Sequence, residues 1–187
     1  MPFIKTQFPG LFIFEPAVFE DNRGYFFESY NQKVFSREGI EINFIQDNQA
    51  SSAFVVIRGL HFQVEPFAQT KLIRALSGKI IDAVVDIRKN SPTFGKAYII
   101  ELSAENKKQL LVPKGFAHGY SVISETAEVF YKCDQFYNKE SEGGLAWNDP
   151  VLSIDWRIPA DKVTVSDKDQ KHASLEKCIH NFVFEGL

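Results

Sequence analysis

Eight polar side chains interrupt a sequence that is otherwise rich in apolar, strand-like runs. They are Arg58, His61, Lys71, Asp82, His118, Tyr131, Tyr137 and Asp169. A small β core filled only by packing has little use for so many polar groups, because each must be hydrogen-bonded or paired when it is buried. Together they supply a base, phenols, cations and carboxylates. If several converge, the set is suited to removing a proton from a carbon next to a carbonyl group.

The histidine of the stretch RGLHFQ, His61, is the candidate base. Histidine titrates near neutral pH, and an aspartate on its second ring nitrogen would fix the tautomer and stabilise the imidazolium. A lysine or imidazole donor near the carbonyl oxygen would stabilise the enolate as its charge develops. A tyrosine on the opposite face of the substrate could return a proton there, which would invert the carbon.

His61 has two other interpretations. A metal ligand is one, because PKGFAHGY carries the Pro113, Gly115 and His118 spacing of a cupin metal segment. The residue two after His61 is Gln63, however, where a second imidazole would be needed, and the next acid, Glu65, precedes a proline that favours a turn. With two histidines and no clear carboxylate, the site lacks the full set of three protein ligands that is usual for an open metal site, and we expect no metal. The other interpretation is an ordinary strand histidine.

The elements that must position these residues are predicted to be strands. Runs rich in Val, Ile, Phe and Tyr recur with turn residues between them: LFIFEPAVF, GYFFESY, INFIQDN, AFVVIRGLHF, KLIRAL, KIIDAVVDI, AYIIEL, QLLV and AEVFYK. This spacing predicts an all-β antiparallel sandwich or barrel, of which the jelly roll is one member, formed as a single domain over residues 1–187. Asn31 is expected to cap a short helix that ends at Gly39, and residues 174–184 are ambiguous between helix and strand.

Period-2 geometry assigns faces within two of these strands. A continuous strand through VFYKCDQFY would place Tyr131, Cys133 and Tyr137 on one face. In IIDAVVDI, Asp82 and Asp86 share a face, and a carboxylate that points into a barrel needs a cation or hydrogen-bond donors.

Composition excludes several classes of protein. The chain has 187 residues, with 21 Lys and Arg against 24 Asp and Glu and a net charge of −3, so no broad basic field is available for nucleic acid. No stretch approaches the roughly 20 apolar residues of a membrane span, and the first residues lack a signal-peptide pattern. The two cysteines have no metal-like spacing. We therefore expect a soluble cytoplasmic protein with reduced thiols and no nucleic-acid or membrane partner.

The sequence resembles the dTDP-4-dehydrorhamnose 3,5-epimerase family of cupin-fold enzymes. The likeness runs in unbroken order from about residue 3 to residue 169, through FEPAVFEDNRGYFFESYN, FIQDNQA, RGLHFQ, QTKLIRALSGKIIDAVVDIRKNSPTFGK, LSAENKKQLLVPKGFAHGYSVISETAE, YKCDQFYNKESEGGLAWNDP and VSDKD. Thr70 stands where the family more often has glycine. The resemblance implies a cupin-type jelly-roll barrel with a few short helices.

The resemblance also implies roles for individual residues. His61 looks like the general base, Asp169 its partner and Tyr131 the proton donor, while Tyr137 is similar to the residue that stacks on the thymine ring. Lys71 and His118 match residues that line the sugar near its keto group, with Asp82 as a supporting carboxylate. The implied contacts to the nucleotide or diphosphate are Arg23, Glu28, Gln46, Asn48, Arg58, Glu142 and Lys168.

The activity implied is epimerisation at C3 and C5 of dTDP-4-dehydro-6-deoxy-D-glucose, which gives dTDP-4-dehydro-L-rhamnose without metal or redox cofactor. Relatives form homodimers that exchange N-terminal strands, and LFIFEPAVF is the candidate exchanged strand. Three alternatives remain open. They are an epimerase of a 4-keto-6-deoxy nucleotide sugar that inverts only one carbon, a metal-dependent cupin enzyme, and a non-catalytic sugar-binding jelly roll.

Overall fold

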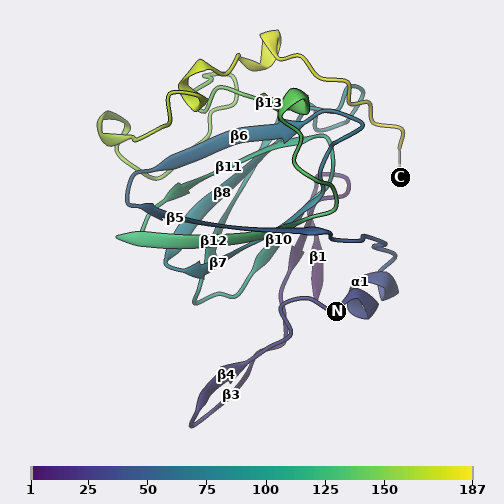
Figure 1. The fold of residues 1–187 in the computed structure, drawn as a ribbon, viewed down its shortest axis with the longest axis vertical. Helices are drawn as coiled ribbons and strands as arrows, with labels where there is room; N and C mark the ends of the chain where they lie inside the picture. The colour runs from purple at the N-terminus through teal and green to yellow at the C-terminus, as the bar shows by residue number, and fades with distance from the viewer. Residues whose placement is uncertain (1, 187) are drawn as a thin grey trace.

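The fold is built from two antiparallel sheets that face each other, as seen in a computed structural model that describes residues 2–186 (Figure 1). Among these residues one sheet has six strands, in the order β1 (Phe3–Lys5), β2 (Phe12–Phe14), β10 (Gln109–Val112), β7 (Lys71–Ser77), β12 (Thr126–Cys133) and β5 (Gln46–Ala53). The other has five, in the order β13 (Glu142–Gly144), β6 (Ile57–Gln63), β11 (Phe116–Val122), β8 (Lys79–Asp86) and β9 (Ala97–Ser103). The predicted all-β jelly roll is confirmed.

The inner faces of the two sheets enclose the main core. Alternate residues of facing strands meet there, among them Ile73 of β7, Val84 of β8 and Val129 of β12. Each is fully buried, as the period-2 pattern requires of residues on a barrel's inner face. The same alternation places the polar residues Lys71, Asp82 and Tyr131 on inward faces, so one end of the barrel interior is polar.

The outer faces of both sheets are also covered. The short helix α1 (Gln32–Arg37) lies against the six-stranded sheet, where Phe35 packs with Phe14 and Leu72. Its start follows the prediction, because the Asn31 side chain accepts the backbone N–H of Lys33. The chain after β13 crosses over the outside of the five-stranded sheet (Figure 1) and buries Trp156 and Phe182 against it.

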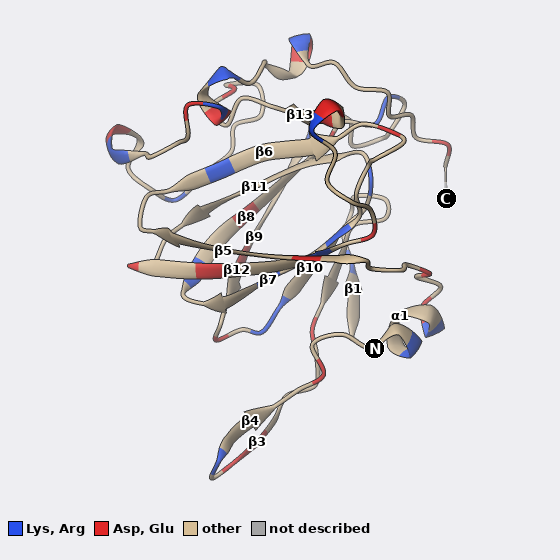
Figure 2. Ribbon diagram, in the orientation of Figure 1, with Lys and Arg blue, Asp and Glu red and all other residues tan. Residues whose placement is uncertain are grey.

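This C-terminal segment contains short 3-10 helices rather than a strand. They span Ala160–Lys162, Asp169–Lys171 and Leu175–Lys177, and another, Lys139–Ser141, precedes β13. The ambiguous residues 174–184 therefore form one helical turn followed by extended chain. Charged residues are frequent in these loops, whereas most of each strand is uncharged (Figure 2). None of the helices in residues 2–186 has the length and apolar character needed to cross a bilayer.

The N-terminal run LFIFEPAVF is not one strand, contrary to the prediction. Residues 12–14 form β2, which pairs with β1 and β10 of the same chain, and the strand stops before Pro16, which has no N–H to donate. The chain then leaves the barrel as a separate hairpin of β3 (Phe19–Asp21) and β4 (Gly24–Phe26) that projects from the body (Figure 1). The predicted strand GYFFESY is likewise limited to residues 24–26.

Candidate active site

The polar end of the barrel interior contains a cavity of about 150 Å³. It is lined by Ala50, Arg58, His61, Lys71, His118, Gly119, Tyr120 and Tyr131, which come from β5, β6, β7, β11 and β12. The structure thus brings together most of the polar residues that interrupt the strand pattern. The cavity is smaller than the roughly 300–1,000 Å³ of a typical ligand pocket, so it can enclose a sugar-sized group but not a whole nucleotide sugar.

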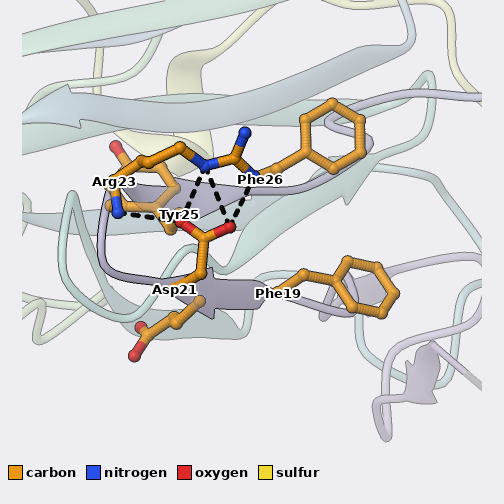
Figure 3. A pocket seen from close by; sticks show the side chains of 7 residues that line it. Phe19, Asp21, Arg23, Tyr25 and Phe26 are labelled. Carbon is orange, nitrogen blue, oxygen red and sulfur yellow. Dashed lines mark hydrogen bonds and ion pairs between the residues drawn. The ribbon is translucent and has the colours of Figure 1, made fainter.

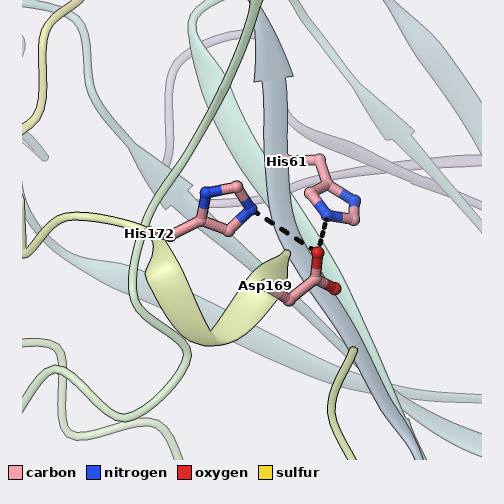
Figure 4. A group of neighbouring side chains, drawn as sticks. All are labelled: His61, Asp169 and His172. Carbon is pink, nitrogen blue, oxygen red and sulfur yellow. Dashed lines mark hydrogen bonds and ion pairs between the residues drawn. The ribbon is translucent and has the colours of Figure 1, made fainter. Parts of the chain in front are cut away.

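His61 and Asp169 form a hydrogen-bonded pair at this cavity. His61 Nε2 lies 2.8 Å from Asp169 Oδ1, although the two residues are 108 positions apart in sequence (Figure 4). Burial opposes ionisation of Asp169, but contacts from His172, His61 and the Gly59 N–H outweigh it and hold the pKa of this carboxyl well below its usual range. Asp169 is therefore a carboxylate, and its bond to Nε2 leaves Nδ1 of His61 as the nitrogen that can accept a proton.

A bulge in β6 makes room for this pair. The register between β6 and β11 shifts between His118 and Tyr120, opposite Gly59. Gly59 has φ 119°, and a side chain there would meet the Cα of Gly119 at 2.6 Å. The Gly59 N–H donates to Asp169 Oδ2 at 3.0 Å, so the bulge itself helps to hold the carboxylate.

A second pair lies deeper in the barrel, on β11 and β8. His118 Nε2 lies 2.8 Å from Asp82 Oδ2, and Asp82 is completely buried. Burial lowers the pKa of Lys71, while the neighbouring Cys133 thiol and the Asp82 and Glu142 carboxylates oppose this shift. A half-buried lysine at the cavity offers N–H donors to an oxygen that gains negative charge.

Tyr131 enters the cavity from β12. Burial is the main cause that raises the pKa of Tyr131 to about 12, with the nearby Cys133 and Tyr120 adding to it. Its phenol is therefore protonated at neutral pH and can donate a proton but not accept one. The Lys71 ammonium lies 5.9 Å from the centre of the Tyr131 ring.

The second predicted phenol does not share this face. β12 ends at Cys133 and the chain bends, with Asp134 Oδ1 accepting the Thr70 N–H at 2.7 Å. Tyr137 therefore lies in the following loop with 56% of its surface exposed, and its hydroxyl donates to Glu142 Oε2 at 3.0 Å. The prediction that Tyr131 and Tyr137 lie on one continuous strand is wrong.

Several predicted nucleotide contacts surround Tyr137 at the rim of the barrel. The Tyr137 N–H donates to Gln46 Oε1 at 3.0 Å, and Gln46 Nε2 donates to Asn48 Oδ1 at 3.1 Å. Glu142 also accepts a hydrogen bond from the Lys168 ammonium. On the cavity wall, Arg58 donates to Ser52 Oγ at 2.9 Å. These residues form a polar rim that continues outward from the cavity.

Arg23 and Glu28 are not brought to this rim within the chain. Arg23 lies at the hairpin turn, where its guanidinium pairs with both carboxylate oxygens of Asp21 (Figure 3). The hairpin residues 19–26 surround a hollow of about 530 Å³ that lies outside the barrel. Glu28 accepts a hydrogen bond from Asn31 at 3.0 Å, beside α1.

The cupin metal set is absent from the described residues, for two physical reasons. Gln63 is buried and bonds to backbone groups, donating to Phe67 O at 2.7 Å and accepting from the Asn138 N–H at 2.6 Å. His118 is bound to Asp82 on the strand next to it. A different group, His61, Asp169 and His172, brings ligand-type atoms within 4.8 Å of one another (Figure 4).

Sequence reasoning missed two residues of this region. Tyr120, the last residue of FAHGY, is 4% exposed and lines the cavity; it lies on β11, which was not among the predicted strands. His172 follows Asp169 by three residues, a spacing that one helical turn brings onto one side. The arrangement as a whole offers a base, an acid and N–H donors around one sugar-sized space, which is what proton transfer next to a carbonyl requires.

Comparisons with known proteins agree with this geometry. The family model described as dTDP-4-dehydrorhamnose 3,5-epimerase matches residues 5–177. The enzyme of that name from Shigella flexneri is 52% identical over 170 residues, which cover 90% of this chain and 93% of the relative.

Two solved structures are similar to the whole fold. The crystal structure of the dTDP-4-dehydrorhamnose 3,5-epimerase from Elizabethkingia anophelis NUHP1 superposes with a TM-score of 0.89 at 52% identity, over 93% of this chain and 96% of that one. The epimerase from Legionella pneumophila Philadelphia 1, in complex with dTDP-4-keto-L-rhamnose, has a TM-score of 0.89 at 43% identity, over 94% of this chain and 93% of that one.

Proposed function

The chain belongs to the dTDP-4-dehydrorhamnose 3,5-epimerase family, and from that premise we propose how its residues carry out the reaction. It is an isomerase that epimerises C3 and C5 of dTDP-4-dehydro-6-deoxy-D-glucose and gives dTDP-4-dehydro-L-rhamnose. The C4 ketone makes the hydrogens on both neighbouring carbons acidic, so one base and one acid on opposite faces of the sugar can serve both centres in turn.

His61 is the base in this proposal. Its Nδ1 takes the proton from C3 or C5, the electrons of the broken C–H bond move toward the C4 oxygen, and an enolate forms. Asp169, 2.8 Å from Nε2, stabilises the imidazolium that results. This hydrogen-bonded pair, whose Asp169 is buried and whose His61 lines the sugar-sized cavity, is the observation that carries the proposal.

Tyr131 is the acid, and Lys71 is the main electrophilic group. Tyr131 donates its phenolic proton to the opposite face of the carbon, which inverts the centre. Because burial raises the pKa of Tyr131 to about 12, the proton is held until a strongly basic carbanion is present. Lys71 donates to the C4 oxygen as it gains charge. His118 lines the sugar near the keto group, and Asp82 orients it through the 2.8 Å contact.

The nucleotide lies along the polar rim in this proposal. Tyr137 stacks on the thymine ring, since an exposed phenol beside a groove presents a flat face. The remaining contacts to the nucleotide or diphosphate are Gln46, Asn48, Arg58, Glu142 and Lys168. Arg58 suits a diphosphate because its planar guanidinium donates two hydrogen bonds at once.

A homodimer completes the site. The projecting hairpin exposes 66% of Phe19, 58% of Tyr25 and 68% of Phe26, an apolar load that favours burial against a second copy. We propose that the exchanged segment is this hairpin rather than β2, which pairs within its own chain. Exchange would carry Arg23 and Glu28 to the partner's rim, where they contact the nucleotide. A cytoplasmic location belongs to the same proposal and is supported by the two free cysteines, Cys133 and Cys178.

Turnover of dTDP-4-dehydro-6-deoxy-D-glucose in deuterated water tests the proposal. Solvent deuterium at both C3 and C5 of the product, read by NMR, is expected, and label at one carbon alone would support an enzyme that inverts a single centre. His61→Asn is expected to lose label at both positions. Unchanged turnover in this variant would refute His61 as the base, and stoichiometric metal whose removal abolishes activity would support the metal-dependent alternative.

A further inference from the structure

A second imidazole lies against the carboxylate that supports His61. His172 Nε2 lies 3.5 Å from Asp169 Oδ1, the same oxygen that His61 Nε2 contacts at 2.8 Å (Figure 4). The two rings are nearly perpendicular, with centres 5.5 Å apart. Nε2 of His172 is buried and has no hydrogen bond of good geometry to any described residue. Asp169 is therefore shared unequally between two histidines.

The backbone is built to hold His172 there. Gly144 of β13 pairs with His61 of β6, and a Cβ on Gly144 would come within 2.5 Å of three atoms of the His172 ring. The ring thus occupies the space left by the missing side chain, directly beside the strand that carries His61. A bridge between Leu145 and Ala173 fixes the segment that carries His172 against β13.

From this geometry, and on the basis of the function proposed above, we propose that His172 is a positioning residue that limits how strongly Asp169 supports the protonated form of His61. A carboxylate that gives part of its charge to a second imidazole stabilises the first imidazolium less. If His172 is itself protonated, the two cations also repel each other. Both effects leave more of His61 as the free base near neutral pH.

The other charged and titratable groups around His61 come from five neighbouring strands. They are Arg58 on β6, Lys71 on β7, His118 on β11, Tyr131 on β12 and Glu142 on β13. The positive charges of Lys71 and Arg58 disfavour the protonated form of His61, as His172 does. The negative charge of Glu142 favours that form. None of them contacts Asp169 Oδ1, so removal of His172 has an effect that these groups do not reproduce.

The test is the pH dependence of kcat/KM in the full-length enzyme. Loss of the His172 ring is expected to move the acid limb of the profile to higher pH, by about half to one pH unit for one hydrogen-bond-sized interaction. His172→Phe keeps an aromatic ring without polar atoms and should show the full shift of the acid limb. His172→Gln keeps an N–H donor and should show a smaller shift. Gly144→Ala, which displaces the ring, should shift the profile in the same direction. The control is His180→Gln, a half-buried histidine outside the cavity, which should leave the profile unchanged.

A readout without substrate separates this proposal from the function on which it rests. The imidazole C–H signal of His61, identified by its absence in His61→Asn, should titrate at higher pH in His172→Phe than in the wild type. A shifted signal in an inactive protein would support the coupling but not the epimerase. No shift in either measurement, a shift to lower pH, or a loss of thermal stability alone would overturn the proposal. The proposal would also be overturned if chelators abolished the activity of the wild type and the His172→Phe substitution abolished it as well. His61, Asp169 and His172 would then hold a metal ion.

Discussion

Asp169→Asn removes one charge from the centre of the proposed site while it keeps the size of the side chain. The amide oxygen can still accept the Gly59 N–H, which Asp169 Oδ2 accepts at 3.0 Å. The amide nitrogen then faces His61 Nε2 as a donor, so Nε2 must accept and the neutral ring must take the tautomer with its proton on Nδ1. Nδ1 of His61, which faces the substrate, would then already carry the ring proton and could not act as the base, and the imidazolium would lose its counter-charge.

The size of the effect follows from the geometry. A hydrogen bond to a charged group contributes about 1.5–3 kcal/mol. The Coulomb attraction across the 2.8 Å contact sets an upper bound of about 6 kcal/mol at an effective dielectric constant of about 20. Because about 1.4 kcal/mol corresponds to a tenfold change in rate, kcat/KM should fall by about 10-fold to about 20,000-fold.

The assay is conversion of dTDP-4-dehydro-6-deoxy-D-glucose followed by NMR, with kcat and KM measured separately. The loss is expected in kcat, since the charge acts on the transition state rather than on binding. Asp167→Asn, an exposed aspartate two residues earlier, is the matched control and should retain wild-type kinetics. A loss of less than tenfold in a folded Asp169→Asn protein, or an equal loss in the control, would refute the reasoning.

Three further predictions concern other parts of the chain. Tyr131→Phe should lose epimerisation yet still exchange substrate protons with deuterated water, because removal of the proton precedes its return; equal loss of both would show that Tyr131 does more than donate. Asp86→Asn should cost about 3 kcal/mol in urea unfolding at pH 7, because it leaves Arg88 buried without its charge partner. Hydrogen bonds from Arg88, Ser91 and Thr93 outweigh burial and lower the pKa of Asp86, so this difference should shrink as pH falls below about 3.9; a constant difference would contradict it. Phe26→Ser on the hairpin should weaken the dimer in light scattering and raise KM more than it lowers kcat; an unchanged mass and KM would exclude the exchanged hairpin.

Local pattern was sufficient to predict the strands on which four cavity residues lie, Arg58, His61, Lys71 and Tyr131. The alternation in IIDAVVDI predicts that Asp82 and Asp86 face the same way, and both are completely buried on β8. The same rule orients Tyr131 and Cys133 on β12. Asn31 caps α1 as its residue type suggests. These features depend on neighbours within a few residues, which sequence displays directly.

Features that depend on distant pairings were not predictable from pattern. β11 was not among the expected strands, because FAHGYSV is short of β-branched residues, and its position comes from pairing with β6 and β8 on either side. The contact of His61 with Asp169 spans 108 positions, and only the family resemblance pointed to it. The course of the chain after Cys133 is set by the contact of Asp134 with Thr70, which moves Tyr137 off the strand.

The division between acid and base in this cavity comes from differences in hydrogen bonding within one buried space. Burial pushes titratable groups toward their neutral forms, and it raises the pKa of Tyr131 and lowers that of Lys71. Asp169 is just as inaccessible, yet two histidines and a backbone N–H keep it ionised. A neutral phenol and a charged carboxylate can therefore coexist at the same pH, and the imidazole between carboxylate and cavity is the group free to exchange protons. A side chain at Gly59 should disturb this balance and the sheet together, because it would meet the backbone of β11 at 2.6 Å while the Gly59 N–H supports the Asp169 carboxylate.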